Sequence, residues 1–203
     1  MRVSTIEVIL FDLGGVLVEL GESPIPPAWL PENNSFTLSD WFLSETAVSF
    51  EKGSITADIF AETLRNDLKI DANPELIIEH FSQWPIGLFP GAKDLLKSLQ
   101  PKYRLAVLTN TNELHWPRIV EEFRLPEYFE CIFASHLLNK VKPESVIFQH
   151  VIDELQVAPA SILFLDDNLK NVEASRKLGI QSLQVSGIEQ ARQGLAALGI
   201  DDL

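Results

Sequence analysis

Residues 9–17 read ILFDLGGVL, an apolar run that ends in one carboxylate, Asp12, with two glycines shortly after it. The segment from Ile6 to Asp12 is rich in strand-forming apolar residues, which is typical of a strand buried on both faces of a parallel sheet. Burying an unpaired carboxylate costs several kcal/mol. Asp12 therefore either lies at a solvated strand end or is placed there to react, and this stretch alone leaves both interpretations open.

Four more strands of this kind are expected further along the chain, each joined to the next by a helical pattern. The strands are predicted at 104–110, 129–135, 161–167 and 181–185, and the helices at 89–100, 116–123, 143–155, 168–179 and 187–198. Alternating strands and helices indicate a parallel sheet with right-handed crossovers and helices on both faces. The sequence therefore predicts an α/β fold with a doubly wound parallel sheet.

Residues 19–85 interrupt that alternation. The stretch ESPIPPAWLPENN holds four prolines, so it cannot be regular helix or central strand, and we interpret it as an ordered linker. Helical spacing follows at 37–53, 56–68 and 73–84, with Thr37 or Ser39, Thr56, and Asn73 before Pro74 as the expected N-caps. We expect a small all-helical cap at 19–85, inserted after the first strand of a core made of 1–18 and 86–203.

The overall composition excludes several classes of partner. The formal net charge is −13 and the pI is about 4.7, which argues against nucleic acid and anionic membranes as partners. Cys131 is the only cysteine, so the chain has no internal disulfide and suits a reducing cytoplasm. No stretch is long and apolar enough to span a bilayer, and Glu7 and Asp12 interrupt the apolar start that resembles a signal peptide. We expect a cytoplasmic monomer or homodimer.

Polar residues gather where the predicted strands end, and ligands of doubly wound sheets bind beyond these ends. Three carboxylates there would repel one another unless a hard divalent cation with oxygen ligands, most naturally Mg²⁺, joined them. A metal ion and a lysine together make a site for phosphate, so a small phosphorylated substrate is expected. The set comprises Asp12, Thr109, Asn110, Asp166, Asp167, and Lys142, whose neighbour Pro143 is the predicted first residue of a helix.

The segments ILFDLGGVL, LAVLTNTN, KPESVIF and LFLDDNLKNV resemble, in order and approximate spacing, the four motifs of the haloacid dehalogenase-like (HAD) hydrolase superfamily. The helical segment between the first two is similar to the cap of subfamily I members. Each motif alone is weak, but four in order are specific. The resemblance implies a Rossmann-like core and a Mg²⁺-dependent phosphoric monoester hydrolase, a phosphatase acting on a small phosphorylated metabolite such as a sugar phosphate.

The resemblance also implies a role for each matching residue. Asp12 would attack phosphorus and form an aspartyl-phosphate that water then hydrolyses. Thr109 and the amide of Asn110 would hold the phosphoryl oxygens, and Lys142 would neutralise their charge. Asn171 would support the carboxylates. The implied Mg²⁺ ligands are Asp12, the backbone carbonyl of Gly14, Asp166 and Asp167.

Gly14 departs from the family pattern, because most phosphatases of the superfamily have there a second aspartate that serves as general acid. Losing such a group costs on the order of 10²–10⁴-fold in rate. Three explanations stay open: a substrate with a good leaving group, a substitute such as Glu19, Glu22 or His115, or a weak or inert phosphate-binding protein. A 2-haloacid dehalogenase also lacks this aspartate, but the paired Asp166 and Asp167 favour phosphoryl transfer.

Other polar and aromatic residues have plain structural interpretations. His115 and Trp116 either line the mouth of the site or begin a helix. Glu51 or Lys52 could meet the substrate, but a solvated turn is the preferred interpretation of SFEKGSI. Packing or solvent contact, rather than ligand binding, is expected for His80, His136, His150, Trp29, Trp41 and Trp84.

Overall fold

The computed structural model describes residues 5–32, 37, 40 and 44–200. Its centre is a parallel sheet whose five strands are β1 (Val8–Phe11), β4 (Arg104–Thr109), β5 (Cys131–Ala134), β6 (Ile162–Asp166) and β7 (Gln181–Gln184). Each of them lies within a stretch predicted to be a strand. The doubly wound parallel sheet is therefore confirmed.

The strand order, β5-β4-β1-β6-β7, places the first strand at the middle of the sheet. From β1 the chain fills one side with β4 and β5 and then crosses to the other side for β6 and β7. The direction of winding thus reverses at β1, and the crevice beyond the carboxyl end of β1 is the place where such sheets bind ligands. Asp12 follows β1 directly.

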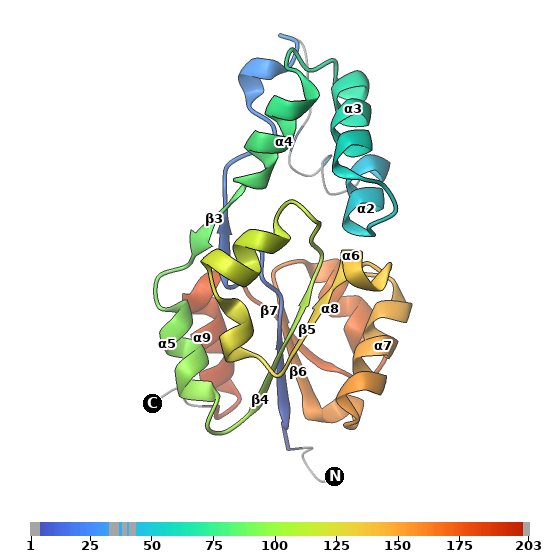
Figure 1. Ribbon diagram of the computed structural model, residues 1–203. Coiled ribbons are helices and arrows are strands. Elements are labelled where there is room, and N and C mark those ends of the chain that lie inside the picture. The colour runs from blue at the N-terminus through green and yellow to red at the C-terminus, as the bar shows by residue number, and fades with distance from the viewer. Residues whose placement is uncertain (1–4, 33–36, 38–39, 41–43, 201–203) are drawn as a thin grey trace.

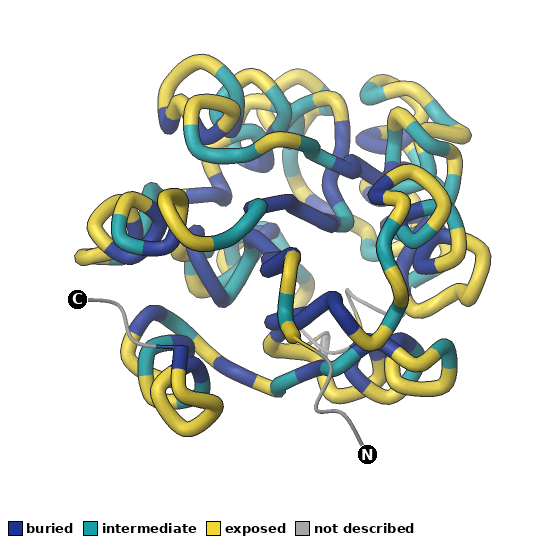
Figure 2. The backbone as a smooth tube through the Cα atoms, turned by 90° about the horizontal axis from the view of Figure 1, so that it is seen from below, coloured by how far each residue is buried: buried dark blue, intermediate teal, exposed yellow. Residues whose placement is uncertain are grey.

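Both faces of the sheet are covered by helices (Figures 1 and 2). Side chains alternate along β1, so Ile9 and Phe11 pack in one apolar cluster and Val8 and Leu10 in the other. The first cluster is completed by α5 (Ala92–Leu99) and α9 (Gly187–Ala197), and the second by α7 (Ser145–Leu155) and α8 (Leu169–Arg176). These buried strands hold the tips of the sheet, and thus the site, in place.

A group of three helices lies beyond the carboxyl edge of the sheet (Figure 1): α2 (Glu45–Glu51), α3 (Ala57–Leu68) and α4 (Pro74–Ser82). We call it the helical segment. It has its own apolar cluster, in which the Phe50 and Phe60 rings stack with their centroids 4.2 Å apart. The predicted caps Thr56 and Asn73 accept hydrogen bonds from the first turns of α3 and α4.

Several local predictions need correction. Thr37, one of the two predicted caps, does make capping bonds: its Oγ1 accepts from the Asp40 N–H (3.3 Å), and its own N–H donates to Asp40 Oδ2 (2.8 Å). The alternative cap Ser39 lies outside the described residues, and helix α2 begins at Glu45 with Ser44 as its N-cap. The helix predicted at 116–123 is present over residues 116–122, but its main part, Arg118–Glu122, is π-helical. The helix expected to begin at Pro143 begins at Ser145, because Glu144 has an extended backbone.

Three short elements were not predicted. Strands β2 (Val18–Leu20) and β3 (Pro85–Leu88) pair antiparallel where the chain leaves and re-enters the core, and α6 (Ser135–Leu138) follows β5. The proline-rich linker contains one turn of 3-10 helix, Pro27–Trp29. Among the described residues, no helix combines the length and the apolar character needed to cross a membrane.

Candidate active site and metal centre

Asp12 lies at the carboxyl end of the central strand, held by the backbone on both sides. Its N–H donates to the Leu165 carbonyl (2.8 Å), which continues the pairing of β1 with β6. The Leu13 N–H donates to Asp12 Oδ1 (2.7 Å), so one carboxylate oxygen is fixed in direction. The residue is buried, and its side chain keeps 11% exposure toward the crevice.

Lys142 enters the same crevice from the turn before α7. Its Nζ lies 2.8 Å from Asp12 Oδ1 and 2.7 Å from Asp166 Oδ2, and its side chain is only 1% exposed. Although burial opposes its charge, the two carboxylates together raise the pKa of Lys142 above its usual range, so it is an ammonium at neutral pH. The predicted meeting of these three side chains is observed.

Asp166, the last residue of β6, is fully buried and satisfied from several directions. Asn171 Nδ2 lies 3.0 Å from each of its carboxylate oxygens, and the Asn168 N–H donates to Oδ1 (2.8 Å). The structure thus places Asn171 as the support for the carboxylates that the sequence predicted. These bonds fix the orientation of Asp166, as outer groups do at metal sites.

Asp167 is exposed and lies over the glycine turn that follows β1. Gly15 has φ +73°, and a Cβ placed there would lie 2.4 Å from Asp167 Oδ2. A side chain at position 15 is therefore excluded twice, by the backbone conformation and by the neighbouring carboxylate. Gly14 has no positive φ, and a Cβ there would meet Leu20 Cδ1 at 3.3 Å. Of the two glycines after Asp12, Gly15 alone has a backbone conformation that requires a glycine.

Asp12, Asp166 and Asp167 each offer an oxygen within 4.8 Å of the others. Burial, opposed by Lys142 but aided by the other two carboxylates, raises the pKa of Asp12 to about 8. Partial desolvation and the charge of Asp166 raise the pKa of Asp167 to about 6. Three carboxyl groups thus share one lysine, their mutual repulsion favours protonation when no cation is bound, and hard oxygen ligands at this spacing suit Mg²⁺. The donor set fits the expected metal.

Thr109 and Asn110 end β4 beside this cluster. Thr109 is 2% exposed. The Asn110 side chain binds the backbone of Lys142 twice, since its Oδ1 accepts from the Lys142 N–H (2.9 Å) and its Nδ2 donates to the Lys142 carbonyl (3.1 Å). The sequence predicted a role for the backbone amide of Asn110 but missed this clamp, which joins residues 32 positions apart.

The suggested substitutes for the missing acid are not in the cluster. Glu19 and Glu22 are exposed. His115 is buried against Phe81, with its Nε2 2.8 Å from the Phe81 carbonyl and its Nδ1 3.1 Å from Asn112 Nδ2. Burial lowers the pKa of His115 to about 4. It is a neutral packing residue directly before the helical stretch at 116–122, which confirms the plainer of its two interpretations.

Glu51, in contrast, is not in a solvated turn as preferred from the sequence. It is the last residue of α2 and is half-buried, near enough to Lys142 and the Asn110 side chain for both to act on the pKa of its carboxyl group. Burial, opposed by Lys142, raises the pKa of Glu51 to about 7. Its backbone carbonyl accepts a hydrogen bond from Ser135 Oγ (2.6 Å), which fixes the end of α2 on the core.

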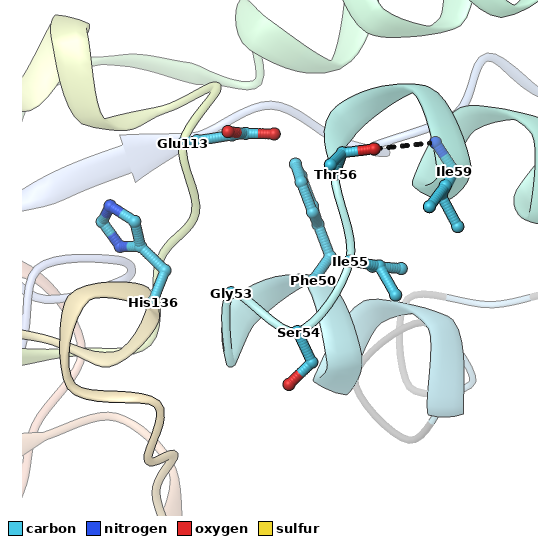
Figure 3. A pocket seen from close by; sticks show the side chains of 8 residues that line it. All are labelled: Phe50, Gly53, Ser54, Ile55, Thr56, Ile59, Glu113 and His136. Atoms are coloured by element: carbon cyan, nitrogen blue, oxygen red, sulfur yellow. Dashed lines mark hydrogen bonds between the residues drawn. The ribbon is translucent and has the colours of Figure 1, made fainter.

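A pocket of about 290 Å³ opens next to this contact, between the helical segment and the core. Figure 3 shows Glu113 and His136 on the core side, across from Thr56 and the Phe50 ring of the helical segment. Its lining does not include the carboxylate cluster. His136 therefore borders a pocket.

The other residues expected to serve packing are placed as follows. His80 and Trp29 pack edge to face, and Trp84 is buried in the helical segment. Trp41 lies outside the described residues.

Comparisons with known proteins agree with this geometry. Residues 6–179 match the haloacid dehalogenase-like hydrolase family. The chain is 27% identical to D-ribitol-5-phosphate phosphatase of Bacteroides thetaiotaomicron, over 94% of this chain and 97% of the relative, and 27% identical to a sesquiterpene phosphatase of Aspergillus oryzae, over 90% and 91%. A crystal structure of a HAD family enzyme from B. thetaiotaomicron, in complex with magnesium and inorganic phosphate, superposes with a TM-score of 0.73 at 27% identity, covering 88% of this chain and 93% of that one.

Proposed function

The chain belongs to the haloacid dehalogenase-like hydrolases, and from this premise we propose that it is a Mg²⁺-dependent phosphatase that works through an aspartyl-phosphate on Asp12. The observation that carries the proposal is the position of Lys142, whose Nζ lies within 2.8 Å of both Asp12 and Asp166 at the switch point of the sheet. A nucleophile, a buried cation and a carboxylate set for a metal meet there in one crevice.

The metal ligands would be Asp12, Asp166, Asp167 and the carbonyl of Gly14. Bound Mg²⁺ would neutralise the carboxylates and the phosphoryl oxygens, which lets two anionic partners approach. Asp12 would attack phosphorus with the oxygen that the Leu13 N–H does not hold.

The chain's own residues would position the phosphoryl group. Lys142 would shift part of its interaction from the carboxylates to the transferring group, while Asn110 holds the Lys142 backbone in place. Thr109 and the Asn110 amide would bind the remaining oxygens. Catalysis of this kind consists mainly of positioning and electrostatic stabilisation.

We infer that the helical segment is the cap, which closes over the carboxyl edge of the sheet and limits water there. The substrate would be a small phosphorylated metabolite. Sugar and polyol phosphates are the first candidates, because a full-length relative is a D-ribitol-5-phosphate phosphatase. A cytoplasmic location and a monomeric or homodimeric state stay predictions.

The test is turnover of p-nitrophenyl phosphate and of a panel of sugar, polyol and acyl phosphates, with Mg²⁺ and with EDTA. We expect Mg²⁺-dependent release of phosphate that Asp12→Asn abolishes at an unchanged melting temperature. Asp94→Asn, the same change at an exposed residue of α5, is the matched control and should keep full activity. Phosphatase activity that persists in Asp12→Asn would refute the nucleophile, and a wild type inactive on every ester would favour a phosphate-binding protein.

A further inference from the structure

We propose that Glu51 is the general acid and base of this phosphatase, acting from α2 in place of the side chain that Gly14 lacks. The inference rests on the proposed function, because it concerns the same reaction at the same site. It answers a question raised by the structure: which group protonates the leaving oxygen when position 14 has no carboxylate?

Geometry first restricts where that group must be. Phosphoryl transfer is in line, so the leaving oxygen lies opposite Asp12 across the phosphorus atom. Asp12 is at the carboxyl edge of the sheet, and the helical segment lies beyond this edge (Figure 1). The leaving oxygen therefore faces the helical segment, and the acid is expected on an element that reaches the crevice from there.

Glu51 is on that element and lies near Asn110 and Lys142, because the Lys142 charge and the Asn110 side chain both oppose the rise that burial causes in the pKa of its carboxyl group. The Asn110 side chain clamps the backbone of Lys142, and Lys142 Nζ is 2.8 Å from Asp12. A contact between Ser135 Oγ and the Glu51 carbonyl (2.6 Å) holds the residue where it is. Glu51 thus borders the residues that would bind the phosphoryl group.

The segment around Glu51 is anchored to the core by further polar contacts. Asn139 Nδ2 donates to the Lys52 carbonyl (3.0 Å), and Lys52 Nζ lies 2.6 Å from Glu144 Oε1. The N-terminus of α3 is held by Glu113, whose Oε1 accepts from the Ala57 N–H (2.7 Å). A catalytic group must be held within a fraction of an ångström, and these contacts, at Glu51 itself and at the residues that follow it, supply that restraint.

The charged surroundings of Glu51 suit proton transfer. Its carboxyl group has a pKa of about 7, raised by burial and opposed by Lys142, so both protonation states are populated near neutral pH. Helix α2 packs on α3 and α6. The titratable groups of these elements and of the segments in contact with them are the exposed Glu45, Asp58, Glu62, Arg65, Asp67 and Glu113, then His136, and the Lys52–Glu144 pair.

The proton balance is complete with water as the only co-reactant. In the first step Asp12 forms a bond to phosphorus, the bond from phosphorus to the ester oxygen breaks, and the Glu51 proton passes to that oxygen, which leaves as an alcohol. In the second step water attacks the phosphorus of the aspartyl-phosphate, the Glu51 carboxylate takes a proton from it, and the bond to Asp12 breaks. Inorganic phosphate leaves, and both carboxyl groups return to their initial states.

The experiment compares Glu51→Gln with wild type on esters whose leaving groups differ in basicity, β-glycerophosphate and acetyl phosphate. We expect kcat/KM for β-glycerophosphate to fall by ~10²–10⁴-fold, the usual contribution of a general acid. For acetyl phosphate, which needs no protonation of its leaving group, kcat/KM should stay within about tenfold of wild type. The fall of the wild-type kcat/KM for β-glycerophosphate at alkaline pH should be absent in Glu51→Gln.

Glu45→Gln, the same substitution at the exposed first residue of α2, is the matched control and should behave as wild type on both esters. The melting temperature of each variant shows whether the fold is kept. An equal loss of kcat/KM on both esters, or no loss on either, would overturn the role of Glu51 and leave the phosphatase standing. Absence of Mg²⁺-dependent turnover in the wild type would instead overturn the proposed function itself.

Discussion

Gly15→Ala tests the metal centre by displacing a proposed ligand, Asp167, without substituting it. The new Cβ would lie 2.4 Å from Asp167 Oδ2, closer than non-bonded carbon and oxygen atoms come, so the carboxylate must move. The backbone at φ +73° also becomes strained, at a cost of about 1–2 kcal/mol for a residue with a side chain. Two effects are thus expected, one on the free energy of unfolding and one on Mg²⁺ affinity.

Gly199→Ala separates these effects. Gly199 has the same φ, +73°, but no atom lies within 4 Å of the position a Cβ would take there, and the residue is exposed. Both variants should lose the strain energy, which for a chain of this size lowers the melting temperature by roughly 2–4 °C per kcal/mol. Only Gly15→Ala displaces Asp167, and we expect it to weaken Mg²⁺ binding by ~10–100-fold, the effect of losing a group that orients a metal ligand.

Calorimetric titration with Mg²⁺ and melting curves with and without EDTA measure both quantities. In wild type and Gly199→Ala, Mg²⁺ at a hundred times its Kd should add about 2.7 kcal/mol of stability, and Gly15→Ala should lose most of this gain at the same concentration. Equal Mg²⁺ affinities in the two variants would refute the assignment of Asp167 to the metal centre.

Two further substitutions probe buried charges. Lys142→Met leaves Asp12 and Asp166 without their cation, and in EDTA it should lower the free energy of unfolding by about 3–5 kcal/mol, measured by chemical denaturation. Much of this loss should be recovered in Mg²⁺. If Mg²⁺ does not change the loss, the lysine and the metal do not share a site. His115 has its pKa lowered from 6.5 to about 4, so its contribution to stability is present above pH 6.5 and is lost as the pH falls toward 4. At 1.36 kcal/mol per pKa unit, this lowering of the pKa corresponds to roughly 3 kcal/mol. His115→Gln should flatten the stability of the protein over this pH range, and parallel curves for the two proteins would show that the imidazole is not the titrating group.

The sheet and most of the carboxylate cluster could be predicted from sequence because their signals are local. Continuous apolar runs indicate strands buried on both faces, and the residue after each run must lie at the sheet edge. Asp12, Thr109 and Asp166 follow from this rule together with parallel winding. The ion pairs of Lys142 with Asp12 and Asp166 could be predicted once the turn before α7 was placed at the same edge of the sheet.

The side of the site formed by the helical segment could not be predicted in this way. Glu51 occupies a short amphipathic helix, where the pattern shows which residues pack within the segment but not how the segment contacts the core. That contact depends on pairs such as Ser135 and Glu51, which are 84 positions apart. The ribbon of β2 and β3 was missed because strands of three or four residues carry too little periodicity. For His115 the sequence left two interpretations open, because a buried polar residue in a connection resembles an exposed one.

The two glycines after Asp12 have different physical explanations, and the difference bears on how the chemistry is controlled. Gly15 is dictated by its positive φ and by Asp167, whereas the backbone at Gly14 can accept a side chain, with a movable Leu20 as its nearest neighbour. The absence of an acid at position 14 is thus no requirement of the fold. With Glu51 as the acid, proton delivery is supplied by the helical segment, so protonation of the leaving group depends on α2 lying over the sheet edge. An enzyme whose general acid follows the nucleophile on the loop after the first strand can protonate a leaving group in any arrangement of its cap. In this protein, cleavage of the phosphorus–oxygen bond would instead be coupled to closure of the helical segment over the sheet.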